Sequence, residues 1–327
     1  MKKQIIIFLK VFALCLLCAG VLCSCSKNAE NPEDVFPKIV AVGFPQYDFA
    51  RNVCGSDDGI KMLIRPGFDS HSYEPSLSDI VAVEEADVLI CNGGESELWL
   101  KKILSSSKNK DLKIISFMET DGIKLYEESS LLHSHICNED HKHSHIGKQH
   151  SHTYDEHVWT SPKNAVVLTD EISRVLCEVN PKSKERYLKN AVAYTNSLKK
   201  IDDELEKISK QSSHKLIAVA DRFPFLYLAK DYDFQYMALF SACSSEGDAG
   251  PKHIAEMIEE IKNHSVKSVF HIELSNKKMA KTVSEKTGAK ILMLHSCQNV
   301  SKEEFESGKT YAELMEQNIK RLKEALL

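Results

Sequence analysis

The sequence predicts an α/β protein of two lobes, each with a mainly parallel four-stranded sheet flanked by helices, joined by one long helix. Three observations support this prediction. Apolar, β-rich runs alternate with helical patterns, the runs form two sets of four, and an apolar stripe at helical spacing separates the sets. Continuous apolar strands that alternate with helices are typical of parallel sheets, because helices cover both faces of such sheets. The chain of 327 residues is long enough for two domains of ordinary size.

The predicted strands and helices alternate in both lobes. The N-terminal lobe is expected over residues 37–180 and the C-terminal lobe over residues 212–327. The predicted strands span residues 38–44, 60–64, 87–91, 112–115, 215–220, 236–240, 267–272 and 290–294. The predicted helices between them include residues 76–85, 96–104, 251–263 and 276–287. This order indicates crossover connections between parallel strands.

Residues 181–211, which link the lobes, predict one long helix. Apolar residues recur there every three or four positions and would form a single stripe over several turns. The stripe consists of Tyr187, Ala191, Tyr194, Leu198, Ile201, Leu205 and Ile208. A coiled-coil partner is the alternative interpretation. We favour a single helix that lies across both lobes, because predicted parallel sheets flank it directly, and such a helix would limit hinge motion.

The N-terminus is expected to be a lipoprotein signal peptide, residues 1–25, followed by a polar tether, residues 26–36. The apolar run is short for a membrane span, and polar sequence follows it at once. Its end, Leu22-Cys23-Ser24-Cys25, resembles a bacterial lipobox, in which the last cysteine is lipidated. An uncleaved membrane anchor is the alternative. The sequence therefore predicts an extracytoplasmic protein that Cys25 attaches to the lipid bilayer of a bacterial cell.

A low-complexity insert, residues 132–153, contains half of the 14 histidines of the chain. The insert has almost no apolar residues, so it cannot build a core and is predicted to be a mobile loop. Neutral imidazoles bind metal ions weakly, so we expect auxiliary metal binding here, and a merely solvated loop is the alternative. These histidines are His133, His135, His141, His143, His145, His150 and His152.

Charge and cysteine content exclude other kinds of site. The net charge of −5 gives no reason to expect nucleic-acid binding. No pair among the cysteines beyond the signal peptide has CxxC spacing, so a thiolate zinc site is not predicted. Disulfides are permitted outside the cell, and the sequence leaves every pairing open. These cysteines are Cys54, Cys91, Cys137, Cys177, Cys243 and Cys297.

Four polar motifs lie where open α/β sheets bind their ligands, beyond the ends of predicted strands or before predicted helices. They contain His71, His157, the pair Asp221 and Arg222, and His295. His71 lies in a loop that a Pro-Gly turn stiffens, and His157 lies just before a helix start. An ordinary surface histidine, or an ion pair that caps a helix, is the alternative interpretation for each motif taken alone.

Together the motifs resemble one family, the metal-binding lipoproteins of ABC importers for zinc and manganese (cluster A-I, or zinc-uptake solute-binding proteins). The most specific match is the loop of residues 66–75 around His71. The segments Asp155-Glu156-His157-Val158-Trp159 and Phe270-His271-Ile272-Glu273 are also similar to family segments. The resemblance covers nearly all of the mature chain. It implies two α/β lobes joined by a long helix, with the metal between them.

The resemblance also implies the metal ligands. By the family pattern, His71 and His157 come from the N-terminal lobe. The third ligand falls on Arg222, which cannot coordinate a metal, so its neighbour Asp221 or a water would take that place. The fourth, usually Asp, is His295 here. The predicted site is therefore a three-histidine set, completed by Asp221 or water.

Imidazole-rich tetrahedral sites suit Zn²⁺, whereas Mn²⁺ prefers more oxygen ligands. The resemblance thus implies a monomeric solute-binding lipoprotein, not an enzyme, that captures Zn²⁺ for the membrane permease of an ABC importer. A Mn²⁺-binding member of the same family and a metal-dependent surface adhesin are the alternatives. A zinc hydrolase is disfavoured, because the sequence has no His-Glu-x-x-His or comparable cluster.

Overall fold

The computed structural model describes residues 36–68, 70–128, 154–242 and 250–327. Residues 37–327 group into one compact unit, and the fold below is that of this unit. The predicted signal peptide, the tether up to residue 35 and the whole histidine-rich insert lie outside the described residues. Within the described ranges, no helix is both long and apolar enough to cross a membrane.

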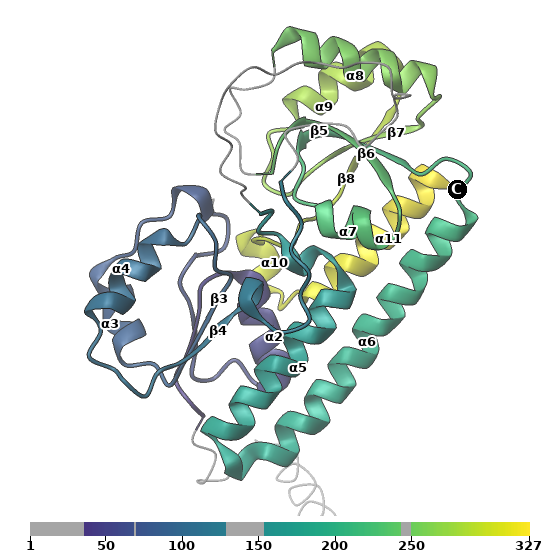
Figure 1. The fold of residues 1–327 in the computed structure, drawn as a ribbon. Coiled ribbons are helices and arrows are strands. Elements are labelled where there is room, and N and C mark those ends of the chain that lie inside the picture. The colour runs from purple at the N-terminus through teal and green to yellow at the C-terminus, as the bar shows by residue number, and fades with distance from the viewer. Residues whose placement is uncertain (1–35, 69, 129–153, 243–249) are drawn as a thin grey trace, which may run out of the picture. The chain divides into compact units, whose positions relative to one another are not determined.

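The first sheet is parallel, with the strand order β2-β1-β3-β4. Its strands are β1 (Ile39–Ala41), β2 (Ile60–Met62), β3 (Val88–Cys91) and β4 (Lys113–Ser116). Val40 and Leu89 pack in one core with α3 (Leu77–Glu84) and α4 (Leu98–Ser106). Residues that alternate with them, such as Ile39, are also buried, so both faces of β1 are covered. The helix α2 (Phe44–Cys54) packs against the same strands (Figure 1).

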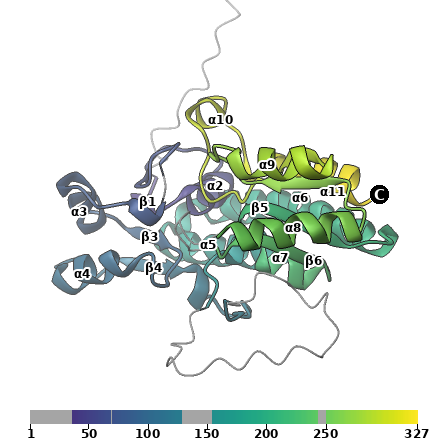
Figure 2. The ribbon, with the colours of Figure 1, turned by 90° about the horizontal axis from the view of Figure 1, so that it is seen from above.

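The second sheet repeats this arrangement, with the parallel strand order β6-β5-β7-β8. Its strands are β5 (Leu216–Arg222), β6 (Gln235–Phe240), β7 (Ser268–His271) and β8 (Lys290–Met293). The helices α8 (Pro251–Asn263) and α9 (Lys278–Thr287) lie side by side over this sheet (Figure 2), where Met257 and Val283 join Ala218 in one core. The short helix α7 (Leu226–Asp231) follows β5.

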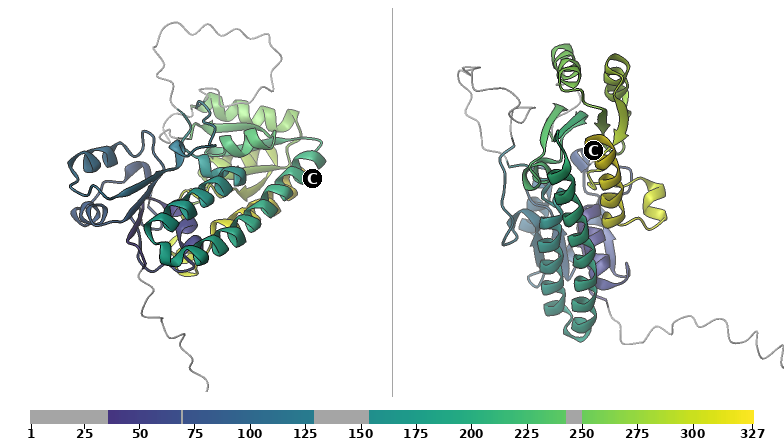
Figure 3. Two further views of the ribbon diagram at one scale, coloured as in Figure 1. Left: turned by 60° about the horizontal axis from the view of Figure 1, so that its bottom comes forward. Right: turned by 90° about the vertical axis from the view of Figure 1, so that its right-hand side faces the viewer.

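The long helix α6 (Lys184–Gln211) connects the two sheets, as predicted. Every residue of the predicted stripe, from Tyr187 to Ile208, is buried. The helix packs against α5 (Pro162–Val179), α2 and α11 (Tyr311–Leu326), and Figure 3 shows α5 and α6 side by side. Because these neighbours belong to the same chain, no coiled-coil partner is needed to cover the stripe.

A buried carboxylate fastens three helices together. Asp48 of α2 accepts hydrogen bonds from the Tyr194 hydroxyl of α6 (2.8 Å) and from the Tyr311 amide of α11 (2.9 Å). The Arg51 guanidinium lies 2.7 Å from the same carboxylate. Burial raises the pKa of Asp48, and these partners oppose the rise. The network ties α2, whose first turn lies at the candidate site, to the helical frame.

All eight predicted strands and all four predicted intervening helices are present, with shifts at their ends. The strand expected over residues 38–44 ends at Ala41, because α2 begins at Phe44 with a proline in its first turn. Ser76 caps α3 in a capping box, as the predicted helix start requires. The remaining short elements are η1 (Ser70–Ser72), η2 (Phe117–Glu119), η3 (Val158–Thr160), η4 (Pro181–Ser183) and α10 (Lys302–Glu306). The lobe boundaries at residues 180 and 212 stay predictions.

Candidate metal centre

His157 lies just before η3 and is buried in the unit. Its backbone amide donates to Asp155 Oδ1 (2.8 Å), and its ring Nδ1 lies 3.1 Å from the same oxygen. Burial opposes protonation of the ring, but the Asp155 carboxylate, helped by Glu156 and Glu128, raises the pKa of His157. A carboxylate at Nδ1 holds a proton there and leaves the lone pair of Nε2 available to a metal ion.

The segment around His157 is fixed on both sides by hydrogen bonds. The Tyr227 hydroxyl donates to the carbonyl of Asp155 (2.7 Å), and the Asn92 side-chain amide donates to the carbonyl of Glu156 (2.8 Å). The Glu156 carboxylate accepts hydrogen bonds from the amides of Glu95 and Ser96. Gly94 permits this approach, because it has a φ of +89° and a Cβ there would lie 2.5 Å from Glu156 Cδ. His157 therefore occupies a preorganised position.

His157 lines a small pocket of about 30 Å³. No lysine or arginine is among the described residues that line it. Burial raises the pKa of the Glu97 carboxyl at its wall to about 7, although the amides of Asn92 and Gly93 lower it. The full lining is Val42, Gly43, Pro45, Gln46, Ile64, Ser70, Asn92, Ser96, Glu97, Trp99, Glu156, His157, Trp159 and Gln298. The pocket thus combines one imidazole with several oxygen acceptors, and its described lining has no lysine or arginine.

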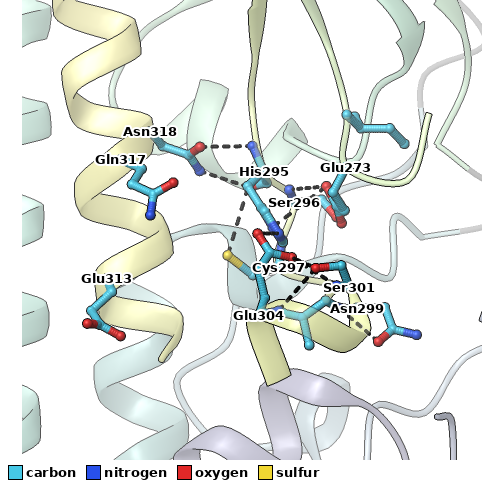
Figure 4. Close-up of polar contacts among 12 residues, drawn as sticks. Glu273, His295, Ser296, Cys297, Asn299, Ser301, Glu304, Glu313, Gln317 and Asn318 are labelled. Atoms are coloured by element: carbon cyan, nitrogen blue, oxygen red, sulfur yellow. Dashed lines mark hydrogen bonds and ion pairs between the residues drawn. The ribbon is translucent and has the colours of Figure 1, made fainter. Parts of the chain in front are cut away.

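His295 follows β8 and is held by contacts within its own part of the fold (Figure 4). Its backbone N–H and C=O pair with the Asn318 side chain at 2.8 and 2.7 Å. Its Nδ1 accepts a hydrogen bond from the Cys297 amide (2.9 Å), so the proton of the neutral ring is on Nε2. Nε2 lies 3.8 Å from Glu304 Oε1, and the contact with His295 holds the pKa of Glu304 at about 2.

Asp221 and Arg222 are the last two residues of β5. The Asp221 carboxylate accepts hydrogen bonds from the Ser275 hydroxyl and from the amide of Arg222 (2.9 Å). Pairing between β5 and β6 shifts register between Val219 and Arg222, so the chain is irregular at this point. Both Asp221 oxygens thus have partners from the second sheet and its loops.

The structure does not bring His157, Asp221 and His295 together. Among the described residues, no three His, Cys, Asp or Glu side chains lie close enough to hold a metal ion. The backbone of His71 lies in η1 beside Ser70, which lines the same pocket as His157. The N-terminal pair of predicted ligands therefore belongs to one neighbourhood, and the complete four-residue set stays a prediction.

Other predicted sites fall outside the described residues. These are the lipid attachment at Cys25 and the seven histidines of the insert. Cys137 and Cys243 also lie outside the described ranges. The described cysteines, Cys54, Cys91, Cys177 and Cys297, are free thiols.

The sequence did not single out Gln46, Asn92 or Gln298 as site residues, and all three line the pocket. Asn92 directly follows β3, so the position of ligand sites at strand ends was a usable signal for it. Gln298 donates to the Ser70 hydroxyl from a loop 228 positions away, and Gln46 lies in the first turn of α2. No local pattern marks these two residues.

Comparisons with known proteins place the chain in a family. The profile of the ZnuA family, zinc-uptake complex component A periplasmic, matches residues 39–325. The zinc-binding lipoprotein AdcA of Streptococcus pneumoniae R6 is 29% identical over 311 residues, which are 95% of this chain and 60% of AdcA. The high-affinity zinc uptake system protein ZnuA of Bacillus subtilis is 28% identical over 318 residues, 97% of this chain and 96% of that protein.

A solved structure of a related protein has a similar fold. The Zn(II)-bound ZnuA-like domain of S. pneumoniae AdcA superposes with a TM-score of 0.71 at 27% identity, over 89% of this chain and 99% of that domain. The chain spans about 60% of the length of the whole AdcA protein. The profile match at residues 39–325 includes both sheets, the long helix and the pocket that contains His157, and the chain belongs to the ZnuA family.

Proposed function

We propose that this protein is an extracytoplasmic, zinc-binding lipoprotein that captures Zn²⁺ and delivers it to the membrane permease of an ABC importer. The observation that supports this most is buried His157, whose Nδ1 faces the Asp155 carboxylate at an acceptor-rich pocket. A histidine oriented by a carboxylate is a common zinc ligand. The names of the relatives, a zinc-binding lipoprotein and a zinc uptake protein, agree with this function.

The proposed ligands are His71, His157 and His295, with Asp221 or a water in the remaining position. Recruitment of His295 requires its Nε2 to exchange the Glu304 contact for the metal. Recruitment of Asp221 requires the carboxylate to leave the Ser275 hydroxyl. Zinc binding is thus expected to rearrange the side of the site formed by the second sheet. The imidazole-rich set favours Zn²⁺ over Mn²⁺.

We propose capture without turnover. A metal hydrolase needs a general base that faces a metal-bound water. The two carboxylates of the pocket, Glu97 and Glu156, instead accept hydrogen bonds from backbone amides. These contacts suit a structural role for both carboxylates. We further propose that the protein acts as a monomer.

Calorimetric titration of the purified mature chain with Zn²⁺ and Mn²⁺ tests this function. One tight Zn²⁺ site is expected, with weaker Mn²⁺ binding and no hydrolytic turnover. His71→Ala, His157→Ala and His295→Ala should each raise the Kd for Zn²⁺ by orders of magnitude, and Asp221→Ala should raise it less. His264 is a partly exposed histidine that directly follows α8, so His264→Ala is the matched control and should bind as the parent does.

Two results would correct the proposal. If His295→Ala binds like the parent while Asp221→Ala loses the metal, the ligand on the second sheet has been assigned wrongly. If the parent binds no Zn²⁺, or prefers Mn²⁺, the proposed cargo is wrong, and binding to immobilised host-surface proteins would then test the adhesin alternative.

Membrane attachment is tested separately at Cys25. Cys25→Ser removes the proposed lipidated thiol and should move the protein from the membrane fraction to the soluble fraction in a cell that processes lipoproteins. Cys177→Ser is the matched control, because Cys177 is a free thiol of the folded unit, and it should leave fractionation unchanged. A membrane-bound Cys25→Ser protein would instead indicate an uncleaved apolar anchor.

A further inference from the structure

We propose that Gln46 and Asn92 bind the water molecule that completes the coordination of the captured Zn²⁺. This inference rests on the proposed function, because it assumes that His157 is a zinc ligand. It adds two neutral amide side chains to the site as positioning residues. Their task would be to hold the water without coordinating the metal directly.

The two amide oxygens are buried acceptors that lack donors. Gln46 is 2% exposed and Asn92 is 4% exposed, and both line the pocket that contains His157. Among the described residues, neither Gln46 Oε1 nor Asn92 Oδ1 has a hydrogen-bond partner. A buried amide oxygen without a donor has lost its hydrogen bonds to water without replacement, which destabilises the protein. Two such oxygens at one small pocket indicate a ligand that donates hydrogen bonds.

The orientation of the Asn92 amide is fixed by its neighbours. Its Nδ2 donates to the carbonyl of Glu156 (2.8 Å) and to the carbonyl of Gly93 (3.4 Å). A flipped amide would place Oδ1 against the Glu156 carbonyl, which is also an acceptor. The hydrogen-bond network therefore leaves Oδ1 as the atom that can serve a ligand in the pocket.

Gln46 has room for its oxygen because residue 43 is a glycine. A Cβ on Gly43 would lie 3.1 Å from Gln46 Oε1. Gly43 lines the same pocket and is the N-cap residue before α2, which carries Gln46 in its first turn. The Asp48 network in the same helix fixes α2 against α6 and α11. The acceptor is thus mounted on a rigid element, as a positioning residue requires.

The size of the pocket suits one water molecule. A site needs roughly 10–15 Å³ to hold a water, and this pocket has about 30 Å³. Val42, Ile64 and the two tryptophans give it apolar walls, and no lysine or arginine is among its described lining residues. Apolar walls lower the local polarity and strengthen the hydrogen bonds inside.

The chemistry of the metal supplies the donor. A water bound to Zn²⁺ is acidified and donates two strong hydrogen bonds, which match two acceptor oxygens. The position that the family pattern assigns to a third protein ligand is Arg222 here, so a water in the coordination sphere is expected. Neutral acceptors favour water over hydroxide, because hydroxide has a single hydrogen for two acceptors.

The test compares Gln46→Met with Gln46→Glu in the otherwise intact mature chain. Methionine keeps the length of the side chain and removes the acceptor, whereas glutamate keeps an acceptor oxygen. Gln46→Met should raise the Kd for Zn²⁺ by about 10–100-fold, the usual effect of losing an outer partner, and Gln46→Glu should recover most of that loss. Asn92→Ala should act like Gln46→Met. Gln235→Met, at an exposed residue of β6, should leave the Kd unchanged.

Co²⁺ provides a spectroscopic readout that a purely structural role would not change. The visible absorption of the Co²⁺-loaded protein is followed against pH to observe deprotonation of the bound water. Gln46→Met should move the midpoint to lower pH, because one acceptor that favours water is lost, and Gln46→Glu should move it to higher pH. The melting temperature of each metal-free variant confirms that it folds.

The outcomes separate this inference from the proposed function. If the parent binds no Zn²⁺, the proposed function fails and the inference fails with it. If the parent binds Zn²⁺ and all Gln46 and Asn92 variants match it in Kd and in Co²⁺ spectrum, the inference is overturned while the function stands. If Gln46→Met loses Zn²⁺ as completely as His157→Ala, Gln46 is a direct ligand and the water-holding role is likewise overturned.

Discussion

At the scale of single residues, Glu97 is expected to make stability depend on pH. Burial raises its pKa to about 7 from a usual value of 4.5. Between these values the folded protein keeps a proton that the unfolded chain has lost. Its stabilising contribution is therefore fully present below about pH 4.5, falls as the pH rises, and is lost above about 7. Glu97→Gln keeps the shape of the side chain and cannot titrate.

Urea unfolding of the metal-free protein at pH 5 and pH 8 measures this effect. The free energy of unfolding should fall less between the two pH values in Glu97→Gln than in the parent. Glu85→Gln, at an exposed carboxylate that pairs with Lys38, is the matched control and should keep the parent's pH dependence. Equal pH dependence in Glu97→Gln and the parent would show that Glu97 is ionised alike in the folded and unfolded chains.

Site residues differ in how far the sequence could predict them. The position of His157 just before a helix was predictable from the helix-start signals Ser161 and Pro162, whereas its role as a metal ligand stays a prediction. The hydrogen-bond partners of a residue were less predictable. The Asp221 carboxylate accepts a hydrogen bond from Ser275, which lies 54 positions further along the chain. Neutral amides such as Gln46 carry no sequence signal of their own. The role proposed for Gln46 depends on which other acceptor oxygens line the same pocket in the folded chain.

At the scale of elements, the apolar stripe of α6 is expected to carry much of the stability of the helical layer. Leu198 is fully buried in this stripe. Leu198→Ala should lower the free energy of unfolding by about 2–5 kcal/mol, because it removes packed atoms and leaves a cavity. Val192 lies on the same helix and is 60% exposed, so Val192→Ala should change stability by less than about 0.5 kcal/mol. Similar values for both variants in urea unfolding would contradict the packing described for α6.

The positions of helices and strands were more predictable than the tertiary contacts that their residues make. The strands were recognised because parallel strands between helical layers are largely apolar runs. The helix α10 and the 3-10 turns were not, because five residues or fewer are too short for helical periodicity. Ser161 occupies the predicted position before α5, yet its hydroxyl donates to Asp231 instead of capping the helix. Local sequence thus specifies where a helix begins, whereas tertiary packing decides the hydrogen-bond partner.

At the scale of the whole molecule, zinc binding and folding should be coupled through the pocket and not through the histidine-rich insert. A ligand that binds the folded chain alone adds about 4 kcal/mol of stability when its concentration is 1,000 times the Kd. Zn²⁺ should therefore raise the melting temperature of the parent and leave that of His157→Ala nearly unchanged.

Deleting residues 132–151 separates the insert from the main site. The insert has almost no apolar residues, so its loss should leave the metal-free melting temperature close to that of the parent. The tight Zn²⁺ site and its stabilising effect should remain, because His71 and His157 lie outside the deletion. The weak sites should disappear from a calorimetric titration, since seven histidines lie within residues 133–152 and all but one are removed. Loss of the tight site on deletion would place the main metal centre in the insert and overturn the assignment to the pocket.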